Sequence, residues 1–205
     1  SPLPIDAEVE DVLDGHLFAT LASRWQGHPA GAIVEYAIAD VLAGRTPVVR
    51  AVMVPGPSQA IEQVAAGKAV LWVKLLDDVS GKLVALRQGA DGAWAQQAAA
   101  LPANATIHLE AAAGREELAF ATVEGMLTPP TLYAVRPGAA PAAVQALPAR
   151  FDASKMEVTQ RFATSKDGTK VPYFLVRKPG AKGPVPALIH AYGGFRLAQT
   201  PTYLT

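Results

Sequence analysis

The chain has 205 residues, 50% of them hydrophobic, so it can bury a core in one large or two small domains. Its 18 basic and 18 acidic residues balance and form no basic run, which excludes the surface expected of a nucleic-acid-binding protein. The sequence has no cysteine, which excludes disulfides, thiolate catalysis and thiolate metal sites.

The first part of the chain contains apolar, β-branched runs that are separated by turn residues. We predict strands over residues 17–22, 32–38 and 47–54, with a turn near Gly44 between the last two. Residues 7–13 fit either a strand or one turn of helix. This part of the chain is therefore expected to supply most of one four-stranded unit.

Two later segments, each about 45 residues long, repeat an arrangement of four short apolar runs. The first begins at Ser58 and has its runs at residues 61–64, 69–76, 83–87 and 94–97. The second begins near Ala103 and has its runs at residues 107–111, 118–123, 132–135 and 144–147. Alanine at residues 96–101 also permits a helix, but turn residues that recur every eight to twelve positions or so favour strands. We predict a mostly β fold, an incomplete β-propeller of about three blades, in which Pro129 and Pro130 break the chain.

The last fifty residues or so carry a hairpin pattern and a short apolar run. Residues 157–162 and 171–176 are predicted to pair across a turn at Asp167 and Gly168. The apolar residues 187–189 lead into Gly193 and Gly194, and we predict that they form a buried strand that ends in a sharp loop.

Three motifs follow one another in this part of the chain: Ser-Lys-Asp-Gly-Thr-Lys-Val-Pro at residues 165–172, Tyr-Gly-Gly-Phe at residues 192–195, and Thr-Pro-Thr-Tyr at residues 200–203. Together they resemble the start of the peptidase domain of the prolyl oligopeptidase family of serine peptidases. Residues 118–133 are similar to the last propeller blade of that family.

The resemblance implies two domains and an activity. Residues 1–150 would be the C-terminal part of a β-propeller, and residues 151–205 the first strands of a truncated α/β-hydrolase peptidase domain. The intact enzyme would cleave short peptides after proline, with the propeller gating their access to the active site.

The catalytic residues of such an enzyme are missing from this chain. An α/β-hydrolase carries its serine in Gly-x-Ser-x-Gly, and Asp and then His follow later. None of the serines has glycine at both of these offsets, and the residues after Gly194 include no Asp and no His. We therefore expect no Ser/Asp/His triad in this chain, and we expect the chain to be inactive alone.

Two residues receive roles from the resemblance. It implies that Tyr192 donates its hydroxyl to the oxyanion and that Phe195 lines the pocket for the substrate proline. The alternatives are a buried Tyr192 bonded to a backbone carbonyl, and Phe195 as a core residue. His190, where the family has an aromatic residue, is expected to be partly buried and hydrogen-bonded at a strand end.

No cofactor and no metal site is predicted, because His16, His28 and His108 are scattered without a partner four residues away. No apolar run approaches the roughly 18 residues of a membrane span, and the first residues lack the pattern of a signal peptide. We expect no membrane partner, and a cytoplasmic or a periplasmic location stays open.

The expected partners are a short peptide substrate and the remainder of the parent chain, and open sheet edges are expected to favour self-association. Two other functions stay open from the sequence. One is a non-catalytic β-propeller that serves as an interaction module, and the other is a sister oligopeptidase with a different preference for the residue before the cut.

Overall fold

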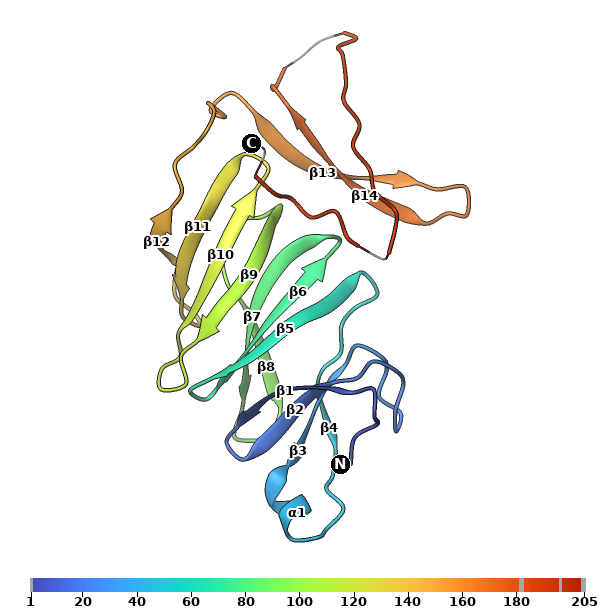
Figure 1. The fold of residues 1–205 in the computed structure, drawn as a ribbon, viewed down its shortest axis with the longest axis vertical. Helices are drawn as coiled ribbons and strands as arrows, with labels where there is room; N and C mark the ends of the chain where they lie inside the picture. Colours follow the sequence, from blue (N-terminus) through green and yellow to red (C-terminus); the bar gives the residue numbers. More distant parts are fainter. Residues whose placement is uncertain (1, 181–182, 196, 204–205) are drawn as a thin grey trace.

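The computed structural model describes residues 2–180, 183–195 and 197–203. In these residues fourteen strands form three four-stranded antiparallel sheets and one two-stranded hairpin (Figure 1). Within each four-stranded sheet the strands lie side by side in chain order, which is the arrangement of a propeller blade. The prediction of about three blades is confirmed.

We name the sheets blades A, B and C in chain order. Blade A contains β1 (Glu8–Leu13), β2 (His16–Thr20), β3 (Ile33–Ala37) and β4 (Arg50–Met53). Blade B contains β5 (Gln59–Gly67), β6 (Val70–Asp77), β7 (Ser80–Gln88) and β8 (Trp94–Ala98). Blade C contains β9 (Ala105–Ala112), β10 (Ala119–Gly125), β11 (Thr128–Val135) and β12 (Ala142–Ala146).

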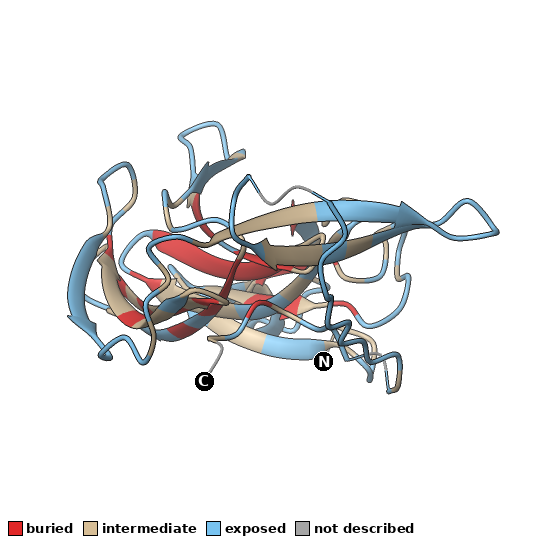
Figure 2. Ribbon diagram, turned by 90° about the horizontal axis from the view of Figure 1, so that it is seen from above, coloured by how far each residue is buried: buried red, intermediate tan, exposed pale blue. Residues whose placement is uncertain are grey.

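The core of the described residues has three apolar clusters, and two of them lie on opposite faces of blade B. The third, in and next to blade A, contains Ala19, Leu21, Ala32 and Val34. Figure 2 shows the buried stretches of the chain in red. Successive side chains of a strand point to opposite faces of its sheet. In β6, Trp72 therefore packs against blade C, whereas Leu71 and Val73 pack against blade A. Because β6 is covered on both faces, its sequence is a nearly continuous apolar run rather than an alternating one.

The first strands of consecutive blades are tied to each other at β-bulges. The extra residue is a glutamate in each case: Glu10 in β1, Glu62 in β5 and Glu110 in β9. Next to these bulges, the Asp11 carboxylate accepts a hydrogen bond of 2.7 Å from the Ala66 amide of blade B. The side-chain amide of Gln63 donates to the Leu109 carbonyl (3.4 Å) and accepts from the Leu109 amide (3.1 Å), which ties blade B to blade C.

The structure decides between the alternatives for two segments. Residues 7–13 were compatible with a strand or a helical turn, and they contain strand β1. The alanine-rich residues 96–101 were compatible with a helix, but β8 pairs with β7 as far as Ala98. The partial unit predicted before Ser58 is a four-stranded blade.

The turn predicted around Gly44 is confirmed, and the short helix α1 (Ile38–Leu42) precedes it. Two other local predictions are wrong. Pro129 and Pro130 lie inside β11, at a register shift between β10 and β11. A bulge is a position where a strand tolerates proline, because one residue there is left out of the ladder. The Pro130 carbonyl still accepts a hydrogen bond from the Leu147 amide, at 2.9 Å.

The second error concerns residues 187–189. They are not a buried strand: they have no regular secondary structure, and Leu188 and Ile189 are 98% and 88% exposed. A buried strand needs neighbours at its edges and on its faces, and the described part of the chain places none there. The start of an α/β-hydrolase sheet is therefore not seen, and the domain boundary after residue 150 stays a prediction.

The predicted hairpin is confirmed as β13 (Glu157–Thr164) and β14 (Lys170–Arg177). Its turn carries Gly168 at a φ of +88°, a backbone conformation that glycine adopts without strain. The side-chain amide of Gln160 in β13 donates a hydrogen bond to the Asp78 carbonyl in the β6–β7 turn. The hairpin is thereby joined to one end of blade B.

No helix in the residues described is long and apolar enough to span a membrane.

Candidate functional site

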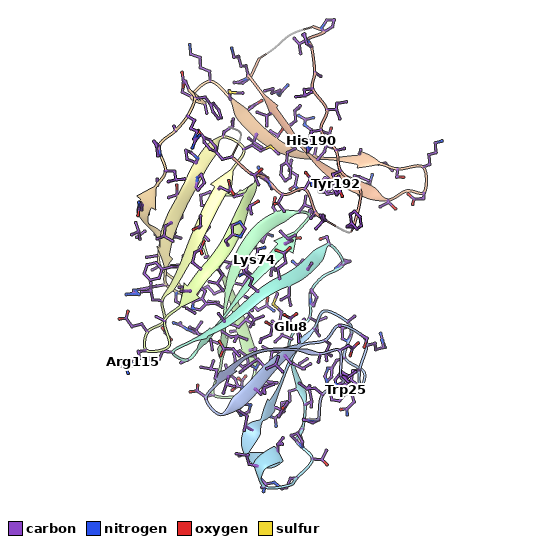
Figure 3. All side chains as sticks on the ribbon, viewed as in Figure 1. Glu8, Trp25, Lys74, Arg115, His190 and Tyr192 are labelled. Carbon is purple, nitrogen blue, oxygen red and sulfur yellow. The ribbon has the colours of Figure 1, made fainter. Side chains whose placement is uncertain are left out.

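The predicted site residues lie in the C-terminal tail that follows β14. Figure 3 labels two residues of this tail, His190 and Tyr192. Tyr192 is 47% exposed, and its hydroxyl makes no hydrogen bond to another described residue. The alternative of a buried tyrosine bonded to a backbone carbonyl is therefore wrong. The phenol is free to donate to a ligand that carries negative charge.

The Tyr192 ring curls back over the second glycine of the motif. A Cβ atom at Gly194 would lie 2.8 Å from the Tyr192 hydroxyl oxygen and 3.0 Å from the ring carbon that carries it. Any side chain at residue 194 would displace the phenol. This contact gives Gly194 a physical role that its position in the sequence did not reveal.

Phe195 occupies the turn after these glycines. Its φ is +55°, which is uncommon for a residue with a side chain, and the Leu197 amide closes the turn by donating to the Gly194 carbonyl at 3.1 Å. Its ring is 90% exposed, so Phe195 is not a core residue. The same turn thus presents both predicted site residues at the surface.

His190 lies on the same tail but is exposed and outside any strand, so the prediction of a partly buried histidine at a strand end is wrong. Like residues 187–189, His190 is exposed because no strand in the described part of the chain pairs with this segment. Among the described residues, no group of three or more His, Cys, Asp or Glu side chains is arranged to hold a metal ion.

Two surface depressions lie away from the Tyr192 turn. One of about 200 Å³ is lined by Glu124, Pro130, Leu147, Pro148, Arg150 and Tyr203. The other, of about 320 Å³, lies between blades B and C and is lined by Trp72, Ala85, residues 97–100 and residues 136–140. Neither includes Tyr192 or Phe195, so the predicted proline pocket is not formed at either of them.

The carboxylate of Glu35, which is buried between blades A and B, was not predicted from the sequence. Glu35 in β3 is only 2% exposed. One of its oxygens lies 3.0 Å from His16 Nδ1, and the other accepts hydrogen bonds from Trp94 Nε1 (3.3 Å) and Gln88 Nε2 (3.4 Å). A glutamate inside the apolar run Ile-Val-Glu-Tyr was the available signal. These partners satisfy a group that would be costly to bury alone.

A second charged group inside the core is Lys74 of β6, whose side chain is 9% exposed and paired with the bulge residue Glu62. Burial lowers the pKa of the Lys74 ammonium, because the low-dielectric interior disfavours the charged form. Since Lys74 and Glu62 belong to paired strands of blade B, they support the bulge and are not part of the Tyr192 turn.

The chain is similar to known peptidases along almost its entire length. It is 33% identical over 213 aligned residues to an uncharacterized peptidase of Sinorhizobium fredii, which covers 98% of this chain and 29% of the relative. The solved structure of a post-proline cleaving enzyme from Rickettsia typhi matches 98% of this chain and 30% of its own, with a TM-score of 0.76 and 28% identity.

A shorter match, 32% identical over 80 residues, joins 38% of this chain to 11% of a prolyl endopeptidase from Elizabethkingia miricola. A scan against models of protein families finds no match. The chain therefore spans less than a third of the length of these relatives.

Proposed function

The chain belongs to the prolyl oligopeptidase family, and from this premise we propose that it supplies three propeller blades and the first part of the peptidase domain of a serine oligopeptidase. The intact enzyme cleaves short peptides after proline. The blades limit which peptides reach the active site, and the nucleophile comes from residues outside this chain.

The observation that carries the proposal is the order of the structural elements. Three consecutive four-stranded blades lead directly into a hairpin and a Tyr-Gly-Gly-Phe turn among the residues described, and a post-proline cleaving enzyme has the same fold over 98% of the chain. The absence of a Gly-x-Ser-x-Gly motif from the sequence supports an inert segment of a larger enzyme over a complete one.

Tyr192 is proposed to stabilise the oxyanion that forms when the serine attacks the scissile carbonyl. Its side chain is exposed, its hydroxyl makes no hydrogen bond to another described residue, and Gly194 leaves room for the ring to lie over the turn. A neutral phenol that has no internal hydrogen bond donates to developing negative charge without first losing one. Phe195 presents an exposed ring that is free to contact a substrate proline.

The remainder of the parent chain is the proposed partner of the C-terminal tail. Large apolar side chains lie exposed on the tail and the hairpin, namely Val171, Val185, Leu188, Ile189, Phe195 and Leu197. Exposed apolar surface of this kind is typical of an interface that another part of a protein covers. In the isolated chain, the same surface and the open sheet edges are expected to favour self-association, which sedimentation at increasing concentration measures.

The proposal is tested in the intact gene product, obtained by sequencing the gene on both sides of this segment and expressing it whole. We expect hydrolysis of a chromogenic peptide with proline before the cut, and little hydrolysis of the matched arginine peptide. Preference for arginine would instead indicate the sister specificity. No hydrolysis of either peptide by a folded product would favour the non-catalytic interaction module.

Tyr192→Phe in the same product isolates the oxyanion role. Removing one oxyanion donor lowers kcat by roughly 100-fold or more in enzymes of this kind, and KM is expected to change little. Tyr173→Phe is the matched control, because Tyr173 is an exposed tyrosine on β14. Equal kcat values for the two variants would contradict the assignment of Tyr192.

A further inference from the structure

The Thr-Pro-Thr-Tyr motif at residues 200–203 has no role in the proposed chemistry, yet it makes the most specific contacts of the tail. We infer that residues 197–203, which we name the strap, fasten the C-terminal segment to blade C, with Tyr203 as the positioning residue. In Figure 1 the tail crosses the hairpin and then returns to the end of blade C near β10.

Tyr203 is held by its backbone and by its side chain. Its amide donates a hydrogen bond of 2.9 Å to Glu124 Oε2 in β10. Its hydroxyl oxygen accepts a hydrogen bond of 2.9 Å from the Arg150 amide. Its ring stacks on Phe151, with the ring centroids 5.3 Å apart and the planes at 12°. Pro201, two residues earlier, is buried.

These contacts differ from those of the rest of the tail, where Leu188, Ile189 and Phe195 are almost fully exposed. The depression of about 200 Å³ beside Tyr203 is lined mainly by apolar groups, including Pro130, Leu147 and Pro148. A tyrosine suits such a position because its ring fills apolar space while its hydroxyl reaches a polar partner.

The strap also fixes the segment that links blade C to the hairpin, residues 147–156. At the start of this linker, the Leu147 amide donates to the Pro130 carbonyl of β11. Three residues later Arg150 donates to Tyr203, and Phe151 stacks on its ring. Residues 147–151 are therefore tied to blade C at two points, directly at Leu147 and through the strap at Arg150 and Phe151.

The consequence for the enzyme rests on the proposed function. The strap joins the segment that carries Tyr192 to blade C through Tyr203, which lies 11 residues further along the chain. It thereby sets how the Tyr192 turn is oriented relative to the propeller. The fastening itself requires no catalysis, so it is testable in the isolated chain.

Hydrogen–deuterium exchange tests the contact directly. Tyr203→Phe keeps the ring and removes the hydroxyl oxygen that accepts from the Arg150 amide. We expect the Arg150 amide to exchange roughly tenfold faster in this variant, as loss of one net hydrogen bond predicts, while amides of β10 and β11 are unchanged. Tyr173→Phe is the control and should leave exchange at Arg150 as it is. An Arg150 amide that exchanges equally in Tyr203→Phe and the parent chain would overturn the contact.

A distance measurement tests the positioning role. The chain has no cysteine, so Ala140→Cys in the β11–β12 loop of blade C and Lys166→Cys in the hairpin turn accept a pair of spin labels at two exposed positions. We expect a narrow distance distribution that broadens in Tyr203→Ala and stays narrow in Tyr173→Ala. If Tyr203→Ala unfolds blade C, Tyr203→Phe replaces it, with a smaller broadening expected. An unchanged distribution in a folded Tyr203 variant would show that the strap does not position the hairpin.

Discussion

Two runs of this chain are both apolar in the sequence, but one is buried in the structure and the other is exposed. The run in β6 is buried on both faces between blades, with Leu71 completely inaccessible. Residues 187–189 form no strand, and Leu188 is 98% exposed. The difference lies in the neighbours: β6 has paired strands on both edges and a blade on each face, and the described residues supply none of these to 187–189.

The largest expected effect comes from the same substitution in the two runs. Leu71→Ala removes side-chain volume from the layer between blades A and B, and we expect the free energy of unfolding to fall by about 3 kcal/mol. Leu188→Ala is the matched variant, expected to change it by less than about 0.5 kcal/mol, because an exposed side chain leaves no cavity. Urea denaturation measures both. Equal losses would show that residues 187–189 are packed in solution.

The blades were predictable because each contains its own pairing partners. Alternation, β-branched runs and turn residues identified the strands of blades B and C, and the turn at Gly168 identified the hairpin. Pro129 and Pro130 misled the prediction, because a bulge that tolerates proline is a property of the paired strands and is invisible in one strand alone. For residues 187–189 the pattern described a strand whose neighbours are absent from the described residues.

The residues of the candidate site were predictable from a sequence motif, but their contacts were not. Sequence reasoning named Tyr192 and Phe195, and the structure places both on one exposed turn. It did not anticipate that the Tyr192 ring lies over Gly194, or that Tyr203 docks on blade C. Both features depend on the path of a tail without regular secondary structure, which hydrophobic periodicity does not describe.

A smaller effect is expected at the tie between blades B and C. Gln63→Ala removes the side-chain amide that both donates to and accepts from the Leu109 backbone, and we expect a loss of about 1 kcal/mol. Gln96→Ala is the control, because Gln96 is an exposed glutamine on β8. Urea denaturation of the two variants measures whether polar contacts, as well as apolar ones, stabilise the packing of blade B on blade C. Equal free energies of unfolding for the two variants would show that the Gln63 hydrogen bonds do not stabilise the fold.

The smallest effect is expected from the Asp77 carboxylate at the end of β6, and it depends on pH. The hydrogen bond from Lys82, with those from Gln59 and Ser58, lowers the pKa of Asp77. A carboxyl whose pKa is lowered by folding stabilises the fold above its unfolded pKa of about 3.9, and this contribution is lost as the pH falls through the folded pKa.

Asp77→Asn is therefore expected to cost about 0.5–1 kcal/mol at pH 7, and the difference from the parent chain should shrink below about pH 4. The exposed Asp6 provides the control, since Asp6→Asn removes the same charge without disturbing the β6–β7 turn. Thermal unfolding across the pH range makes the measurement. A cost for Asp77→Asn that is constant with pH would show that its ionised form does not stabilise the turn.

We propose that this chain carries the gating blades and an oxyanion donor of a serine peptidase but no nucleophile. The most direct test incubates the purified chain with a fluorophosphonate probe, which labels activated serines, and with a chromogenic proline peptide. We expect no covalent labelling and no hydrolysis. Saturable labelling of one of the serines, lost together with peptide cleavage when that serine is changed to alanine, would contradict it.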